Sequence, residues 1–180
     1  MLANPIPAPE LEVERWLNAP NALSLAELRG RVVLIEAFQM LCPGCVAHGL
    51  PQAQRVADTF NDDEVTVLGL HTVFEHHAAQ GRAEALEAFL HEYRIGFPVG
   101  IDRSTGGIPA TMATYRMQGT PTLILIDRDG RLRAQHFGSL PDLVLGAEIM
   151  ALIRDAPMNA EAERERNGDP NCDQISCRVE

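Results

Sequence analysis

Four cysteines stand in two close pairs, Cys42 with Cys45 and Cys172 with Cys177. Thiols at such spacings can do redox chemistry, hold a metal or form a disulfide. The first pair, in the sequence CPGC, lies between a predicted buried strand and a predicted amphipathic helix, which places Cys42 at a helix N-terminus. Unpaired backbone N–H groups there stabilise a thiolate. We therefore expect Cys42 to attack a disulfide and Cys45 to resolve the mixed disulfide.

An acidic residue, Glu36, lies six residues before Cys42 in a nearly continuous apolar segment. In a strand that is covered on both faces, its carboxyl group should point toward the core. A buried acid without a partner holds its proton through a raised pKa. Glu36 is therefore a candidate to exchange a proton with Cys45, and the alternative is a carboxylate that merely reaches the sheet edge.

The pair Thr120-Pro121 follows Gly119 and opens another predicted strand. Proline has no N–H to give to a sheet, and a cis peptide bond is plausible at this position. Such a bond would leave the backbone of Thr120 free to pair with an extended substrate. The alternative is a proline that only begins a strand. We predict that Pro43, Gly44, Thr120 and Pro121 contact the substrate.

Histidines near the end of a predicted strand offer a second possibility. His71 ends that strand, and His76 and His77 follow in the loop, so a metal-binding or acid-base role is conceivable. His48 lies three residues after Cys45, on the same side of the predicted helix. Packed or solvated side chains are the favoured interpretation for all four.

Strands and helices must alternate to position these residues. The segment 31–38 is short, β-branched and nearly continuously apolar, which is typical of a central strand. Apolar residues at helical spacing follow the CPGC turn, and Pro51 should kink that helix. Further strands are predicted at 65–70, 97–101, 121–126 and 132–137, and further helices at 24–30, 83–93 and 141–154. This order predicts a mixed sheet with helices on both faces.

The sequence pattern divides the chain into three parts. Residues 1–22 form an N-terminal extension, residues 23–154 a single domain, and residues 155–180 a polar, flexible tail with little to bury. The tail carries Cys172 and Cys177, a CxxxxC pair that could close into a disulfide and relay electrons to or from Cys42 and Cys45. Solvated thiols without a role are the alternative.

Composition excludes several classes of protein. The net charge of −10 disfavours a nucleic-acid partner. All 15 basic residues are arginines, which excludes lysine chemistry such as Schiff bases. The longest apolar run is far shorter than the roughly 20 residues of a membrane-spanning helix, and the first residues do not read as a secretory signal. We expect a protein without a membrane segment, located in the cytoplasm.

The residues from about 23 to 153 resemble thioredoxin-like proteins, and among them the TlpA-like or redoxin branch. CPGC resembles the active-site motif, Glu36 the buried acid, Gly119-Thr120-Pro121 the cis-proline loop, and LSLAELRGRVVLIEAF the first strand region of TlpA-like proteins. Four features depart from the family pattern. Leu41 replaces the usual aromatic residue, Pro51 lies six rather than five residues after Cys45 and indicates a bulge in the first turn, no lysine neighbours the acid, and Gln39 stands where peroxiredoxins have threonine.

The resemblance implies an α/β protein of thioredoxin fold, with a mixed central β-sheet and helices on both faces. It also implies a thiol-disulfide oxidoreductase that works without a cofactor or a bound metal. Its partners would be a disulfide-containing protein substrate and a dithiol protein that acts as reductant. Two alternatives stay open. Cys42 could be the peroxidatic cysteine of a thiol peroxidase, or the CxxC pair could hold zinc or another thiophilic metal in a non-catalytic module.

Overall fold

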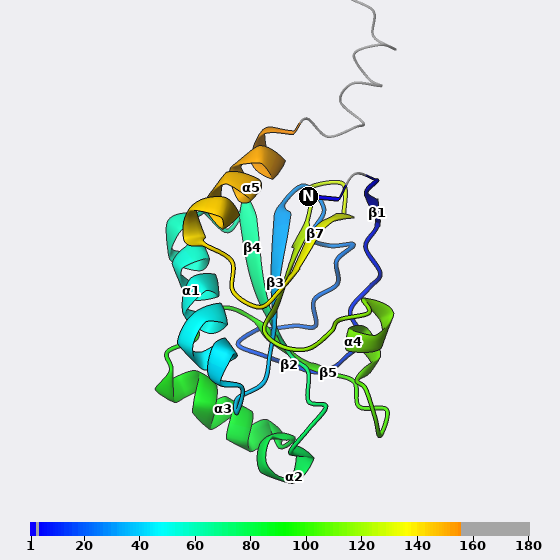
Figure 1. Cartoon of the computed structure of the whole chain (residues 1–180), viewed down its shortest axis with the longest axis vertical. Helices are drawn as coiled ribbons and strands as arrows, with labels where there is room; N and C mark the ends of the chain where they lie inside the picture. Colours follow the sequence, from blue (N-terminus) through cyan, green and yellow to red (C-terminus); the bar gives the residue numbers. More distant parts are fainter. Residues whose placement is uncertain (3, 156–180) are drawn as a thin grey trace, which may run out of the picture.

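The structure, a computed structural model, describes residues 1–2 and 4–155. Its strands are β1 (Ile6–Pro7), β2 (Val13–Leu17), β3 (Val32–Phe38), β4 (Val65–His71), β5 (Val99–Asp102), β6 (Thr122–Ile126) and β7 (Arg131–Phe137). Its helices are α1 (Leu50–Thr59), α2 (His77–Gln80), α3 (Ala83–Glu92), α4 (Ala110–Thr114) and α5 (Asp142–Arg154), and a π-helical turn, η1 (Cys45–Gly49), precedes α1. The strands form one sheet in the order β1-β7-β6-β3-β4-β5-β2 (Figure 1).

The central strand β3 ends at Phe38, shortly before the CPGC turn. All of its residues are buried, as the near-continuous apolar segment predicts. It pairs in parallel with β4 and antiparallel with β6. Because β4 also pairs in parallel with β5, the sheet is mixed, and the predicted α/β class is confirmed.

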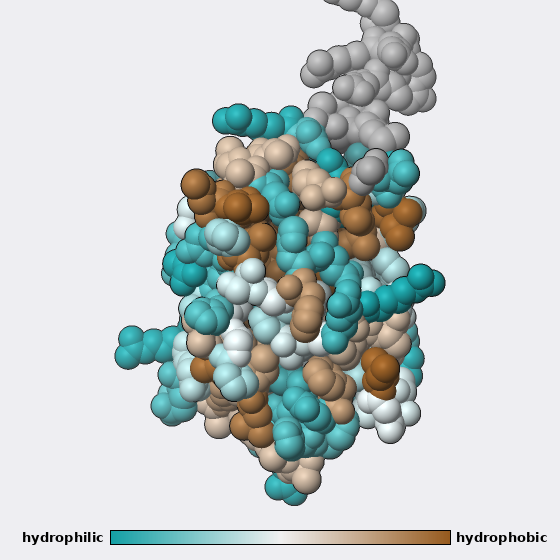
Figure 2. Space-filling view, in the orientation of Figure 1, coloured by the Kyte–Doolittle hydropathy of each residue, from teal (hydrophilic) through white to brown (hydrophobic). Residues whose placement is uncertain are grey.

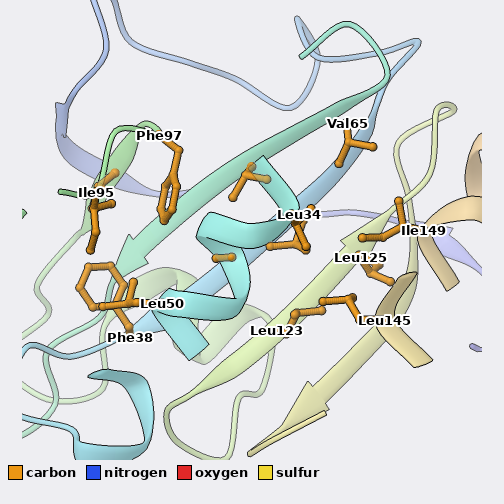
Figure 3. Packing of buried hydrophobic residues seen from close by; sticks show 14 of the residues in the cluster. Leu34, Phe38, Leu50, Val65, Ile95, Phe97, Leu123, Leu125, Leu145 and Ile149 are labelled. Carbon is orange, nitrogen blue, oxygen red and sulfur yellow. The ribbon is translucent and has the colours of Figure 1, made fainter. Parts of the chain in front are cut away.

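Two apolar layers cover the sheet. Alternate residues of β3 face opposite sides, so that Leu34 belongs to one cluster and Ile35 to the other. The larger cluster lies between the sheet and α1, α3 and α5, and Figure 3 shows Leu34 and Leu50 within it. The smaller cluster lies on the face that α4 covers (Figure 1). These layers hold the end of β3 in place on both faces.

The N-terminal segment belongs to the sheet rather than extending from the domain. Strand β1 pairs antiparallel with β7 at one edge, and β2 pairs antiparallel with β5 at the other. The predicted domain start at residue 23 is therefore too late. The side chains of both strands are largely exposed or half-buried. Their sequences therefore lack the apolar alternation from which a strand could be predicted.

The helix predicted at 24–30 is wrong. The expected side-chain pairing is present, since the Ser24 Oγ and N both lie within hydrogen-bond distance of a Glu27 carboxylate oxygen. The backbone nevertheless forms only turns, with N–H groups bonded three residues back, and the Glu10 carboxylate accepts the N–H groups of Leu25 and Ala26. A carboxylate from a distant part of the chain thus satisfies these N–H groups.

Candidate active site

Cys42 and Cys45 form a disulfide directly after the end of β3, with their Cα atoms 5.3 Å apart. Their exposure differs: Cys42 is partly accessible, whereas Cys45 is 0% exposed. The backbone N–H of Cys45 donates to Cys42 Sγ at 3.2 Å. The predicted contact between the first sulfur and a helix-start N–H is therefore present in the structure.

The helix that follows starts as a π-helical turn, Cys45–Gly49, and continues as α1 from Leu50. The N–H of Leu50 donates to the carbonyl of Cys45, five residues back. One extra residue is thus wound into the first turn, as the position of Pro51 indicates. Pro51 lies in the first turn of α1, where proline is tolerated, so the predicted kink takes the form of this wider turn.

The loop before β6 lies against the disulfide. Its Thr120-Pro121 peptide bond is cis, and the Thr120 carbonyl oxygen lies 3.5 Å from Cys42 Sγ. A Cβ added to Gly44 would lie 3.3 Å from Pro121 Cδ, so the CPGC turn and this loop are in close contact. Pro43 is exposed beside them. The structure thus brings the four predicted substrate-contacting residues together.

Glu36 lies behind this turn and is 1% exposed. Burial raises its pKa to about 8, and its Oε1 has no hydrogen-bond partner among the described residues. The carboxyl group reaches the helix next to Gly49: a Cβ on that glycine would lie 2.1 Å from Oε1. Only a glycine leaves room for the acid. Sequence reasoning missed Gly49, although a glycine within a predicted helix is itself a signal because it is unfavourable there.

A cavity of about 200 Å³ adjoins Glu36. It lies between the first helical turns and the segment 138–142 that leads into α5. Its polar lining includes Gln52, which donates to Asp142 Oδ1 at 2.6 Å, and Asp142 also pairs with Arg55 at 2.9 Å. A cavity of this size and polarity has room for water.

On the other side of the CPGC turn, two buried glutamine side chains hold the backbone. Gln80 Nε2 donates to Gln39 Oε1 at 3.0 Å, and the N–H of Leu41 donates to Gln80 Oε1 at 3.1 Å. Gln39 Oε1 also accepts the N–H of Phe74 at 3.3 Å. This pair therefore ties the residue before the first cysteine to the segment 74–80. Nothing in the sequence pattern indicates that Gln80 has this role.

The histidines do not form a second centre. His71 is 2% exposed and packs against Phe38, with ring centroids 5.3 Å apart. Burial lowers its pKa to about 4, and its Nε2 has no partner in the described part of the chain. His76 and His77 are exposed, and His48 is exposed at the lining of the cavity. Across residues 1–2 and 4–155, no group of three or more His, Cys, Asp or Glu side chains could hold a metal ion.

The predicted electron relay through Cys172 and Cys177 stays a prediction, because both cysteines lie outside the described residues. Among residues 1–2 and 4–155, no helix is both long and apolar enough to cross a bilayer.

Two solved structures are similar to this chain over most of its length. A thioredoxin-like superfamily protein is 59% identical, with a TM-score of 0.81, over 83% of this chain and 97% of its own. A thiol-disulfide isomerase from Corynebacterium glutamicum is 48% identical, with a TM-score of 0.80, over the same shares of the two chains. The predicted thioredoxin fold is therefore confirmed.

Among curated proteins, Protein DipZ of Mycobacterium tuberculosis is 30% identical over 158 residues, which cover 83% of this chain. The thiol-disulfide oxidoreductase ResA of Bacillus cereus is 26% identical over 116 residues, 64% of this chain. The match spans 21% of the length of DipZ and 60% of that of ResA. The model of the AhpC/TSA family matches residues 6–135, from β1 into β7. These matches confirm the resemblance to the TlpA-like or redoxin branch, and the chain belongs to the AhpC/TSA family.

Proposed function

We propose that this chain is a thiol-disulfide oxidoreductase that exchanges disulfides through Cys42 and Cys45. The observation that carries the proposal is the asymmetry of the pair: Cys42 is accessible and accepts a helix-start N–H, whereas Cys45 is fully buried. Cys42 Sγ can therefore meet a substrate, whereas Cys45 Sγ is shielded from solvent until it attacks the mixed disulfide.

The proposed catalytic cycle transfers two electrons from the reduced cysteine pair to the substrate disulfide. In the reduced protein the Cys42 thiolate attacks a substrate disulfide, a Cys42-substrate bond forms, and one substrate thiolate leaves. Cys45 then loses its proton and attacks Cys42 Sγ. The second substrate thiolate leaves, the substrate has gained two electrons, and the Cys42-Cys45 disulfide seen in the structure is formed. A dithiol partner reduces it by the reverse steps.

Glu36 would exchange the proton of Cys45 in this cycle. Its carboxyl group lies beside Gly49, one turn along the helix from Cys45, so a water molecule in the adjoining cavity would carry the proton between them. Because burial raises the pKa of Glu36 to about 8, both protonation states are accessible near neutral pH. The acid form can protonate Cys45 when it leaves as a thiolate, and the carboxylate can accept its proton when it attacks.

The proposed partners are a protein substrate and a protein reductant. A protein substrate would extend over Pro43 and Gly44 and pair with the backbone of Thr120, next to Pro121 and the accessible sulfur. The reductant would be a dithiol protein, in keeping with the cytoplasmic location that we propose. The reduction potential of the cysteine pair, measured against glutathione, would give the direction of electron flow.

A thiol peroxidase is the second candidate, and membership of the AhpC/TSA family favours it. In that reaction, the Cys42 thiolate attacks a peroxide oxygen, the O–O bond breaks, water or an alcohol leaves, and Cys42 becomes a sulfenic acid. Cys45 then converts the sulfenic acid to a disulfide with loss of water. Gln39 stands where peroxiredoxins have threonine, and its amide is bonded to Gln80 and Phe74. We therefore rank disulfide exchange first, and peroxide consumption by the reduced protein separates the two.

Trapping experiments on the full chain test the proposal. Cys45→Ser should accumulate a mixed disulfide with a disulfide-bonded peptide, whereas Cys42→Ser should form none and lose turnover by at least about a thousandfold. Cys172→Ser with Cys177→Ser is the matched control for loss of thiols outside the site. Turnover of the peptide by Cys42→Ser at the wild-type rate would overturn the assignment. A tenfold or greater slowing of mixed-disulfide release in Glu36→Gln would support the proton role.

A further inference from the structure

A tight turn, residues 39–42, connects the end of β3 to the first cysteine. The N–H of Cys42 donates to the Gln39 carbonyl at 3.2 Å, which closes the turn. The Cys42 carbonyl in turn accepts the N–H of Val46 at 3.1 Å, within the first turn of the helical segment. Cys42 is therefore both the last residue of the tight turn and the residue from which the helix starts. The conformation of this turn determines where Cys42 Sγ lies.

The side chain of Gln80 is bonded to two places in this turn. Its Oε1 accepts the N–H of Leu41 at 3.1 Å, a donor that the hydrogen bond closing the turn does not use. Its Nε2 donates to Gln39 Oε1 at 3.0 Å and to the Glu75 carbonyl at 2.9 Å. Both N–H donors and the oxygen of one amide are thus bonded. Rotation of the amide by 180° would point its NH₂ group at the N–H of Leu41, so its orientation is fixed.

Gln80 is also the residue that attaches α2 to the rest of the domain. It is 1% exposed, and among the four residues of α2 it alone is buried. The surface at the lower end of the view in Figure 2, where α2 lies in Figure 1, mixes hydrophilic with apolar residues. A helix of four residues is not stable by itself in water. The buried amide therefore joins a short, otherwise exposed helix to the turn that precedes the nucleophile.

We propose that Gln80 is a positioning residue for Cys42, because it holds the turn 39–42 in the conformation that keeps Cys42 Sγ near the N–H of Cys45. That N–H lies 3.2 Å from the sulfur in the structure. In the oxidised form the S–S bond also joins the two cysteines. Reduction breaks this bond, and the hydrogen bonds of the turn then hold Cys42 without it. The inference rests on the proposed disulfide exchange and adds to it a residue that determines the reactivity of the nucleophile.

Loss of the Gln80 amide should have two consequences for the reduced protein. Hydrogen bonds weaken steeply as their angle departs from linearity, so a looser turn leaves the Cys42 thiolate less stabilised by the N–H of Cys45. A smaller thiolate fraction slows attack, and a less stabilised reduced form lowers the reduction potential of the pair. A role confined to holding α2 in place would lower the stability of the protein but change neither property.

The test measures the alkylation of Cys42 by iodoacetamide over a range of pH, on the reduced full-length protein. Mass spectrometry of the fragment that contains Cys42 distinguishes this thiol from the other three. Gln80→Leu should slow alkylation on the acid side of the profile about fivefold, the typical effect of one lost hydrogen bond, and move its midpoint to higher pH. The equilibrium with glutathione should shift by up to about fivefold toward the Cys42-Cys45 disulfide.

Two further variants separate positioning from folding. Gln80→Asn keeps the amide, but its side chain is one methylene shorter and cannot reach both Leu41 and Gln39, so alkylation should slow at least about twofold. Gln39→Leu should resemble Gln80→Leu. The double variant should be no slower than either single one, because the two amides act as one unit.

The matched control is Gln54→Leu in α1. The Gln54 amide donates to the carbonyls of Tyr93 and Arg94, at 3.2 and 3.1 Å, and so joins α1 to the end of α3. Its loss should lower the free energy of unfolding and leave the alkylation profile unchanged. An equal slowing in Gln54→Leu and Gln80→Leu would overturn the inference, since general loosening of the domain would then be sufficient.

A wild-type alkylation profile in both Gln80→Asn and Gln39→Leu would also overturn the inference while leaving disulfide exchange intact. Both variants remain informative if Gln80→Leu does not fold. Failure of the wild type to reduce any disulfide, with dithiothreitol present as electron donor, would instead refute the proposed function. The alkylation profiles would still report whether Gln80 controls the reactivity of Cys42.

Discussion

Glu36 on β3 and His71 on β4 are two buried titratable residues on neighbouring strands, each with an unpaired polar atom. Burial moves both toward the uncharged form: it raises the pKa of Glu36 to about 8 and lowers that of His71 to about 4. Their surroundings differ. Glu36 adjoins a polar cavity and the helical turn of Cys45, whereas His71 packs against the ring of Phe38.

The comparison shows that a shifted pKa is not sufficient for an acid-base role. Both residues have lost solvation, but Glu36 also adjoins a cavity with room for a water molecule and lies one turn from Cys45, whose thiol gains or loses a proton in the proposed cycle. His71 packs against the ring of Phe38. We assign it a packing role, and substitutions at the two positions test this distinction.

The largest expected effect is on the pH dependence of stability through Glu36. The folded protein keeps its proton up to about pH 8, whereas the unfolded chain releases it near pH 4.5. Relative to Glu36→Gln, wild-type stability is therefore fully present below pH 4.5 and lost as the pH rises through 8, by up to about 5 kcal/mol. Urea unfolding at a series of pH values measures the difference, and parallel curves for the two proteins would contradict it.

His71 should act in the opposite direction and on the acid side. Its pKa is lowered from 6.5 to about 4 by burial, so the unfolded chain binds a proton before the folded one does. Relative to His71→Leu, wild-type stability is present above pH 6.5 and lost as the pH falls through 4, by up to about 3 kcal/mol. The rate of disulfide exchange at pH 7 should stay unchanged in this variant. A decrease of tenfold would remove the distinction between the two residues.

The smallest expected effect concerns the space that Glu36 occupies. Gly49→Ala would place a Cβ on the carboxyl oxygen and should lower the free energy of unfolding by about 2 kcal/mol. Gly146→Ala is the matched control, because that helical glycine in α5 has no atom within 4 Å of the added Cβ, and it should stabilise the protein slightly. In a double-mutant cycle, Glu36→Ala should remove most of the Gly49→Ala penalty. Additive effects would show that the two residues do not compete for space.

The local sequence pattern was sufficient to predict those strands and helices whose structure depends on residues that are close together in the chain. The buried strand 31–38, the strand 65–70, the helix 83–93 and the hairpin around Asp129-Gly130 are all present. The extra residue before Pro51 correctly indicated the wide turn of η1. In each case the residues that determine the structure are neighbours in the sequence.

Features that depend on distant partners could not be predicted. The turn at 24–30 depends on Glu10, and β2 on its pairing with β5, more than 80 residues away. The same limit applies to the site. Spacing in the sequence indicated Cys42, Cys45 and Glu36 as candidates, but Gln80 reaches the CPGC turn through a contact that no local pattern encodes.

The pairing of the sheet edges has a consequence for the order in which the molecule can be completed during translation. Strands β1 and β2 leave the ribosome before the rest of the sheet, yet β2 must wait for β5, and β1 must wait for β7. Strand β7 ends at Phe137, about 130 residues after Pro7, the last residue of β1. At about 5–20 residues per second, the N-terminal strand stays without its partner for roughly 6 to 25 seconds. The strand pairings at both edges of the sheet therefore form late. A nascent chain arrested before residue 131 has the Cys42-Cys45 motif but lacks the pairing of β1 with β7.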